Sequence, residues 1–65
     1  MKLNPEERAT LVRIYNAGNL GLSAFPVSET VTVIRLVQQG FAVMKPNGEG
    51  PPLTFITEAG REALS

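Results

Sequence analysis

The chain has 65 residues, a formal net charge of zero, and no Cys, His, Trp or Asp. Without Cys or His there is no zinc site, thiol nucleophile or imidazole base, and without Asp the usual calcium-loop spacing cannot occur. A chain of this length predicts a single small domain over residues 1–65, with little interior to shelter a catalytic carboxylate. We therefore expect a non-enzymatic protein with no metal and no cofactor.

Composition favours a folded chain, because 43% of the residues are hydrophobic and only 18% are charged. With no disulfide available, stability must come from a compact apolar core or from a partner. No apolar run is long enough to cross a membrane, and residues 1–5 do not resemble a signal peptide. These features predict a cytoplasmic protein without membrane contact.

The first predicted element is a helix over residues 5–17. Asn4 is a good N-cap, Pro5 suits the first helical position, and Glu7 completes the pattern of a capping box. Gly18 is a suitable stop. Residues at helical spacing are expected to form the buried stripe of this helix: Leu11, Ile14 and Tyr15.

Residues 19–27 predict a buried, irregular connection. Pro26 disfavours helical geometry at the residue before it, so only a short turn of helix around Ser23–Phe25 is compatible with the sequence. The apolar residues of this segment are expected to point inward: Leu20, Leu22 and Phe25.

A second helix is predicted to begin at Ser28, acting as N-cap, and to end at Gly40. Its many β-branched residues are also compatible with a strand, but the opening and closing residues favour a helix. The buried positions share helical spacing, with two further residues widening the stripe: Val31, Ile34 and Val37, then Val33 and Leu36.

After Gly40 the apolar pattern alternates. Residues 41–45 and 53–56 predict two strands, and the turn-rich segment 46–52, with Asn-Gly at its centre, predicts an antiparallel hairpin. The core candidates of the whole chain are the apolar residues at these periodic positions: Leu11, Ile14, Tyr15, Leu22, Phe25, Val31, Ile34, Val37, Phe41, Val43, Phe55 and Ile56.

Thr57 can cap a last short helix, Glu58–Leu64. Gly60 is unfavourable in a helix interior by about 1 kcal/mol relative to Ala, and close packing against the strands would explain it. A surface pair between Glu58 and Arg61 is expected. The inward residues of this helix are predicted to be Ala59, Ala63 and Leu64.

Residues 27–64 resemble the second half of a winged helix-turn-helix domain of the MarR and PadR type. The segment Ser28–Phe41 is similar to a recognition helix leading into a wing strand, and Asn47-Gly48 lies where the wing tip would be. Ile56–Leu64 is similar to the Leu-Thr-Glu-Ala-Gly-Arg segment that opens the helix after the wing. The implied fold is α+β, a small winged-helix-like domain ordered α, short turn, α, β, β, α with an antiparallel hairpin.

This resemblance implies a transcription regulator that binds double-stranded DNA, with a homodimer as one possible assembly. The recognition helix would enter the major groove, and the wing would touch the backbone or the minor groove. Carried over by position, the implied contacts are four helix residues and three wing residues: Ser28, Thr30, Thr32 and Arg35, then Lys45, Asn47 and Gly48. Arg35 as an ordinary solvated residue, and Lys45–Gly48 as an ordinary hairpin turn, remain the alternatives.

The sequence also departs from that pattern. Only Asn19–Val27 is available for the helix that should precede the recognition helix, and the recognition helix itself is nearly neutral. The alternative function is therefore a protein–protein interaction module, a small adaptor or inhibitor that keeps the winged-helix shape without binding DNA. An exposed patch of apolar residues would favour that function, with Leu20, Met44 and Leu53 as candidates.

Overall fold

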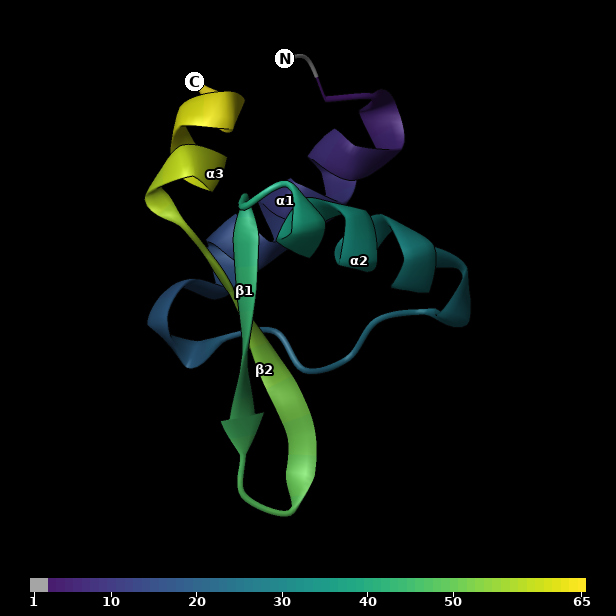
Figure 1. Cartoon of the computed structure of the whole chain (residues 1–65), viewed down its shortest axis with the longest axis vertical. Helices are drawn as coiled ribbons and strands as arrows, with labels where there is room; N and C mark the ends of the chain where they lie inside the picture. The colour runs from purple at the N-terminus through teal and green to yellow at the C-terminus, as the bar shows by residue number, and fades with distance from the viewer. Residues whose placement is uncertain (1–2) are drawn as a thin grey trace.

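The computed structural model describes residues 3–65, so Met1 and Lys2, which belong to the N-terminal segment judged unlike a signal peptide, lie outside it. The elements in chain order are α1 (Pro5–Ala17), the 3₁₀ turns η1 (Gly18–Leu20) and η2 (Val27–Glu29), α2 (Thr30–Gln38), β1 (Ala42–Asn47), β2 (Gly50–Ile56) and α3 (Glu58–Leu64). The α-helices gather at one end and the hairpin projects away from them (Figure 1). The predicted α+β class is confirmed. No helix within residues 3–65 combines the length and apolar character needed to cross a membrane.

Helix α1 has the predicted bounds and the predicted cap. Asn4 Oδ1 accepts from the Glu7 backbone N at 2.7 Å, and Glu7 Oε1 accepts from the Asn4 backbone N at 3.1 Å, which completes the capping box. The expected burial of Tyr15 is wrong, since it is 52% exposed. The buried face is Thr10, Leu11 and Ile14, so it is centred one position earlier and Tyr15 lies beyond its edge.

The connection between α1 and α2 is irregular, as predicted, but no helical turn forms at Ser23–Phe25. Leu22 instead pairs with Thr54 of β2, through backbone hydrogen bonds of 2.9 and 3.0 Å. Gly21 permits this approach, because it has a φ of +75° and a Cβ there would stand 3.0 Å from Leu53 and the Phe55 ring. Leu20 is 84% exposed in η1, so its predicted burial is wrong.

Helix, and not strand, is the structure of α2, but the helix starts later than predicted. The backbone N of Glu29 donates to Pro26 O at 2.9 Å, which makes residues 27–29 a 3₁₀ turn, and the Ser28 side chain caps nothing. The buried residues of α2 are Val33 and Leu36. The predicted burial of Val31 and Ile34 is wrong, since α1 and the hairpin cover only one side of this nine-residue helix.

The antiparallel hairpin is confirmed, with Ala42 opposite Ile56 and Met44 opposite Thr54. The expected loop over residues 46–52 is wrong, because the strands continue through it and only residues 48–49 form the turn. Three prolines fit in these strands because the projecting end of the hairpin has two free edges. Buried Ala42 faces the core, so its neighbour Val43 points to the opposite side and is 38% exposed, contrary to expectation.

Helix α3 is tied to the start of β1. The Thr57 hydroxyl accepts from the Gly60 backbone N at 3.1 Å and donates to Gly40 O at 2.6 Å, which confirms the predicted cap. Gly60 is buried against Phe41, as its position in the sequence predicted. Two expectations fail: Ala59 is exposed, and Glu58 forms no ion pair with Arg61.

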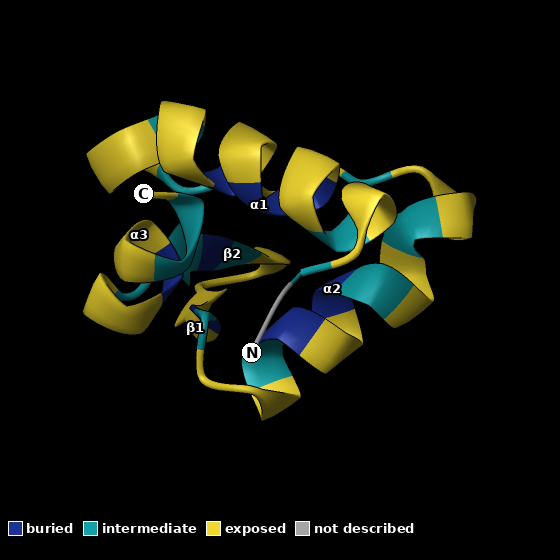
Figure 2. Cartoon of the chain, turned by 90° about the horizontal axis from the view of Figure 1, so that it is seen from above, coloured by how far each residue is buried: buried dark blue, intermediate teal, exposed yellow. Residues whose placement is uncertain are grey.

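The core lies where α1, α2 and the base of the hairpin meet. Its fully enclosed cluster is Leu11, Ile14, Leu36 and Ala42. Buried positions line the sides of α1 and α2 that face the hairpin, and the outer sides are exposed (Figure 2). Partly buried hydrophobic residues surround this cluster: Leu3, Leu22, Phe25, Val37, Phe41, Ile56, Ala63 and Leu64.

One polar side chain in this interior is unsatisfied. Thr54 is fully buried and its Oγ1 has no hydrogen-bond partner among the residues described. We expect Thr54→Val to raise the free energy of unfolding by about 1 kcal/mol, because it removes a desolvated hydroxyl while keeping the side-chain shape. Urea denaturation measures the change.

Thr57→Val is the matched control, since the Thr57 hydroxyl has two partners. This change should lower the free energy of unfolding by about 1–2 kcal/mol through loss of the cap. A destabilising effect of Thr54→Val would show that the Thr54 hydroxyl is satisfied after all.

Candidate functional site

The seven residues implied as DNA contacts fall into two groups, one on α2 and the turn before it and one near the turn of the hairpin. Thr30 and Arg35 are exposed on α2, whereas Thr32 is half-buried and lines a hollow together with Ser28. The three hairpin candidates are all exposed near the turn: Lys45, Asn47 and Gly48. Within residues 3–65 no hydrogen bond or ion pair joins the side chains of the hairpin candidates to those on α2.

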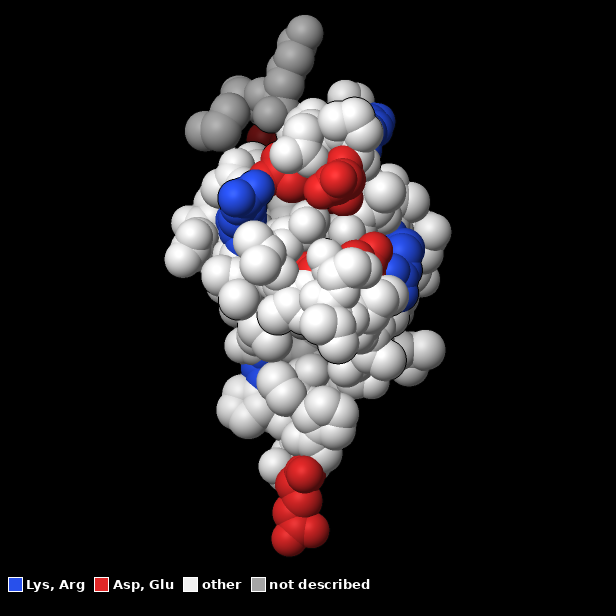
Figure 3. Space-filling model, turned by 90° about the vertical axis from the view of Figure 1, so that its right-hand side faces the viewer, with Lys and Arg blue, Asp and Glu red and all other residues white. Residues whose placement is uncertain are grey.

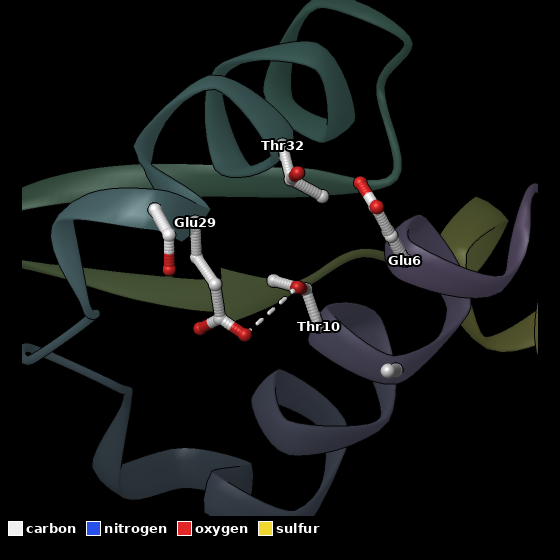
Figure 4. Close-up of a pocket in the computed structure, with 6 residues that line it drawn as sticks. Glu6, Thr10, Glu29 and Thr32 are labelled. Carbon is white, nitrogen blue, oxygen red and sulfur yellow. Dashed lines mark hydrogen bonds between the residues drawn. The ribbon is translucent and has the colours of Figure 1, made fainter.

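The hollow lies between the first half of α1 and the start of α2, and has a volume of about 280 Å³. Glu6, Ala9 and Thr10 line it from α1, and Ser28, Glu29 and Thr32 line it from the other side. We call this set of residues the acidic notch. Figure 4 shows Glu6 pointing towards Thr32, while the hydroxyl of buried Thr10 donates to Glu29 Oε2 at 3.4 Å. Two carboxylates beside Ser28 and Thr32 disfavour a phosphate at these residues.

Arg13 makes its contacts with other residues of the same chain. Its guanidinium forms an ion pair with Glu29 and lies over the Phe25 ring, with 5.9 Å from Cζ to the ring centroid. These contacts attach the connection and the start of α2 to α1. They also leave Glu6 as the carboxylate of the acidic notch that has no ion-pair partner in the described part of the chain.

The remaining basic side chains are dispersed. Arg8 donates to Leu64 O at 3.2 Å, at the end of α3, and Lys45 Nζ lies 5.5 Å from the Phe55 ring centroid. Arg35 has no ion-pair partner in the described structure. Figure 3 shows separate basic groups with acidic ones between them, and an acidic group at the lower tip, where the turn contains Glu49. This face lacks the continuous positive stripe of a DNA-binding surface.

The outward side of α2 and its preceding turn is apolar instead. Val27 is 92% exposed, Val31 60% and Ile34 48%. The three-residue spacing places Val31 and Ile34 side by side on α2, and Val27 is exposed in the 3₁₀ turn just before the helix; we call these three residues the α2 stripe. Of the helix residues that the resemblance implies as groove contacts, Thr30 and Arg35 are exposed, but the valine and isoleucine side chains exposed beside them offer no donor or acceptor to a base edge.

Two residues of the α2 stripe, Val31 and Ile34, are core candidates by sequence but are exposed in the structure. A signal against that assignment is present in the sequence, because the apolar residues of α2 spread over more than half of the helix circumference. A short helix in so small a domain cannot bury that much of its surface against its own chain. The residues concerned are Val31, Val33, Ile34, Leu36 and Val37.

The described residues therefore offer an apolar stripe and, beside it, an acidic notch with one carboxylate free of ion pairs. These surfaces are complementary in character to apolar and basic groups. Comparison of the chain with known protein families, with curated proteins and with solved structures gave no match.

Proposed function

We propose that the chain is a small, non-enzymatic protein-interaction module with a winged-helix-like arrangement, and that it binds its partner through the α2 stripe. The observation that carries this proposal is the exposure of Val31 and Ile34 on one side of α2, together with that of Val27 in the turn before it. Contiguous apolar side chains with polar neighbours are typical of surfaces that a partner protein covers.

The order of elements supports the winged-helix-like arrangement, since helix, connection, helix, hairpin and helix follow each other as the resemblance implies. The connection contains 3₁₀ turns and a bridge to β2 in place of the helix that should precede the recognition helix. The helix that would enter the DNA groove, α2, is thus present. The connection replaces the helix that would position α2 in the groove. This combination is consistent with a retained shape and a different partner.

Burial of the α2 stripe against a partner would stabilise the complex. Moving a Val or Ile side chain from full exposure to full burial contributes about 1.5–3 kcal/mol. The three partly or fully exposed side chains together can supply on the order of 3–5 kcal/mol to a complex. This contribution is apolar, so the complex should tolerate salt.

The proposal predicts that the immobilised chain retains a protein from an extract of its native cells at about 0.5 M NaCl, where phosphate contacts are strongly weakened. Val31→Glu should abolish retention, because it places a charge in the centre of the stripe. Tyr15→Glu is the control, since Tyr15 is 52% exposed on α1, outside the α2 stripe. Circular dichroism confirms folding of both variants, and mass spectrometry identifies what is retained.

DNA binding is the second candidate function, and one observation favours it. Arg35 and Lys45 are both exposed, and neither forms an ion pair within residues 3–65. The same extract, together with an NMR titration of duplex DNA at low salt, separates the two functions. Retention of nucleic acid alone, with salt-sensitive shifts in residues 28–48 that Arg35→Ala and Lys45→Ala weaken, would refute the protein-binding proposal.

A further inference from the structure

We propose that the partner on the α2 stripe is a second copy of this chain, held by antiparallel packing of α2 on α2 about a two-fold axis. This inference rests on the proposed function, since it names the occupant of the same surface. A two-fold interface uses one patch on both copies, so the patch must be complementary to itself. The α2 stripe and its flank meet this requirement in shape and in charge.

The apolar part is self-complementary in its order along the helix. In an antiparallel pair centred between Val31 and Ile34, Val31 of each copy meets Ile34 of the other. Val27, in the turn before α2, then lies near the last residue of the other copy's α2, Gln38, which is exposed on the same side as Val31 and Ile34. Each branched side chain thus contacts the other copy, and the polar Gln38 lies at the margin of the interface, where water can reach it.

The charged part is self-complementary as well. Arg35 follows Ser28 and Thr32 by seven and three residues, so it lies on the flank of α2 that borders the acidic notch. The two-fold axis is perpendicular to the plane of the two helices, so this flank of one copy meets the same flank of the other, in reverse order. Arg35 of each copy then faces the acidic notch of the other copy, where Glu6 has no ion-pair partner of its own.

The symmetry therefore forms two equivalent Arg35–Glu6 pairs from groups that are unpaired in a single copy, judged over residues 3–65. The formal net charge of zero means that two copies approach without long-range repulsion. Arg35 and Glu6, both unpaired within the described part of a single copy, and the zero net charge favour a second copy over a strongly charged partner. An acidic partner would meet Glu6 with a like charge, and a basic partner would meet Arg35.

The size of the surface sets the expected strength. A stable interface buries about 800 Å² on each partner, which is less than a fifth of the 4468 Å² that one copy exposes. The α2 stripe supplies the apolar centre and its flanks supply a polar margin. Because α2 has only nine residues, we expect a weak dimer with a dissociation constant of about 100 µM.

Sedimentation equilibrium over about 5–500 µM tests the assembly, and a monomer–dimer equilibrium is the expected result. Ile34→Glu should give a monomer over the whole range with unchanged circular dichroism, and Tyr15→Glu, at a similarly exposed position on α1, should dimerise like the unaltered chain. A monomeric unaltered chain at about 500 µM, or a dimer that survives Ile34→Glu, would overturn the inference.

Charge reversal tests the two-fold pairing itself. Arg35→Glu alone and Glu6→Lys alone each place like charges opposite one another twice, so each should weaken the dimer by about tenfold. A mixture of the two single variants restores opposite charges in both pairs, and should form a mixed dimer of normal strength. Failure of the mixture to recover the dimer would overturn the inference.

These outcomes separate the inference from the proposed function. A monomeric chain that retains a different protein through the α2 stripe overturns the second copy and leaves the interaction module standing. The chain could also dimerise with the predicted variant pattern while retaining only nucleic acid from extract. That result would support the inference and refute the proposed binding of other proteins. Where both hold, the protein retained from extract is the chain itself.

Discussion

Gly60→Ala is expected to lower the free energy of unfolding by about 3 kcal/mol, although Ala is the better helix former by about 1 kcal/mol. A Cβ at this position would stand 2.7 Å from Ile56 Cγ1 and closer still to Phe41 O. Phe41 O cannot move aside easily, because it already accepts a hydrogen bond from the Thr57 backbone N at 3.1 Å. Moving α3 away to relieve the clash would break that bond and the one from the Thr57 hydroxyl to Gly40 O.

Thermal and urea denaturation measure this effect. A loss of about 3 kcal/mol lowers the midpoint temperature of so small a domain by more than about 10 °C. Glu62→Ala is the matched control, because Glu62 is exposed in the same helix and should tolerate Ala without loss. If Gly60→Ala instead stabilised the protein, α3 would not pack against the start of β1 as described.

Local signals in the sequence predicted the elements well. The Asn4 capping box, the Thr57 cap and Gly60 each act through atoms a few residues away or through one close approach, so a single sequence contains enough to recognise them. The hairpin was recognised from Asn47-Gly48 for the same reason, although its prolines made the loop look longer than it is. Element type follows from short-range chemistry.

The orientation of the elements could not be predicted in the same way. Helix α2 is apolar on several sides, and only the positions of α1 and the hairpin decide that Leu36 is covered while Ile34 is not. The same holds for Tyr15 on α1 and for Val43 on β1, each next to a residue that is buried. The candidate site depends on these orientations. Ser28 and Thr32 were therefore expected to contact a DNA groove, whereas they line the acidic notch, which the sequence did not predict.

Leu36→Ala and Ile34→Ala form a matched pair that tests this orientation of α2. Leu36 is fully buried in the core cluster, so its truncation leaves a cavity and should lower the free energy of unfolding by about 3 kcal/mol. Ile34 is 48% exposed, so its truncation in the monomer should cost less than about 1 kcal/mol. Urea denaturation at about 5 µM, where dissociated chains are expected to dominate, measures both. Equal losses would mean that α2 is rotated and that the α2 stripe is not a free surface.

The same pair of variants also connects stability to assembly. Any partner that binds only the folded chain raises its apparent stability by mass action, so a dimer becomes harder to unfold as its concentration rises. Between about 5 and 500 µM, the unaltered chain and Leu36→Ala should both gain stability, provided Leu36→Ala remains folded. Ile34→Ala should gain much less, because it weakens the surface through which the two copies bind. Truncation of a docking residue changes the stability of the monomer little but strongly reduces the rise of stability with protein concentration. Truncation of a core residue does the opposite, so the two measurements together distinguish a docking surface from a core.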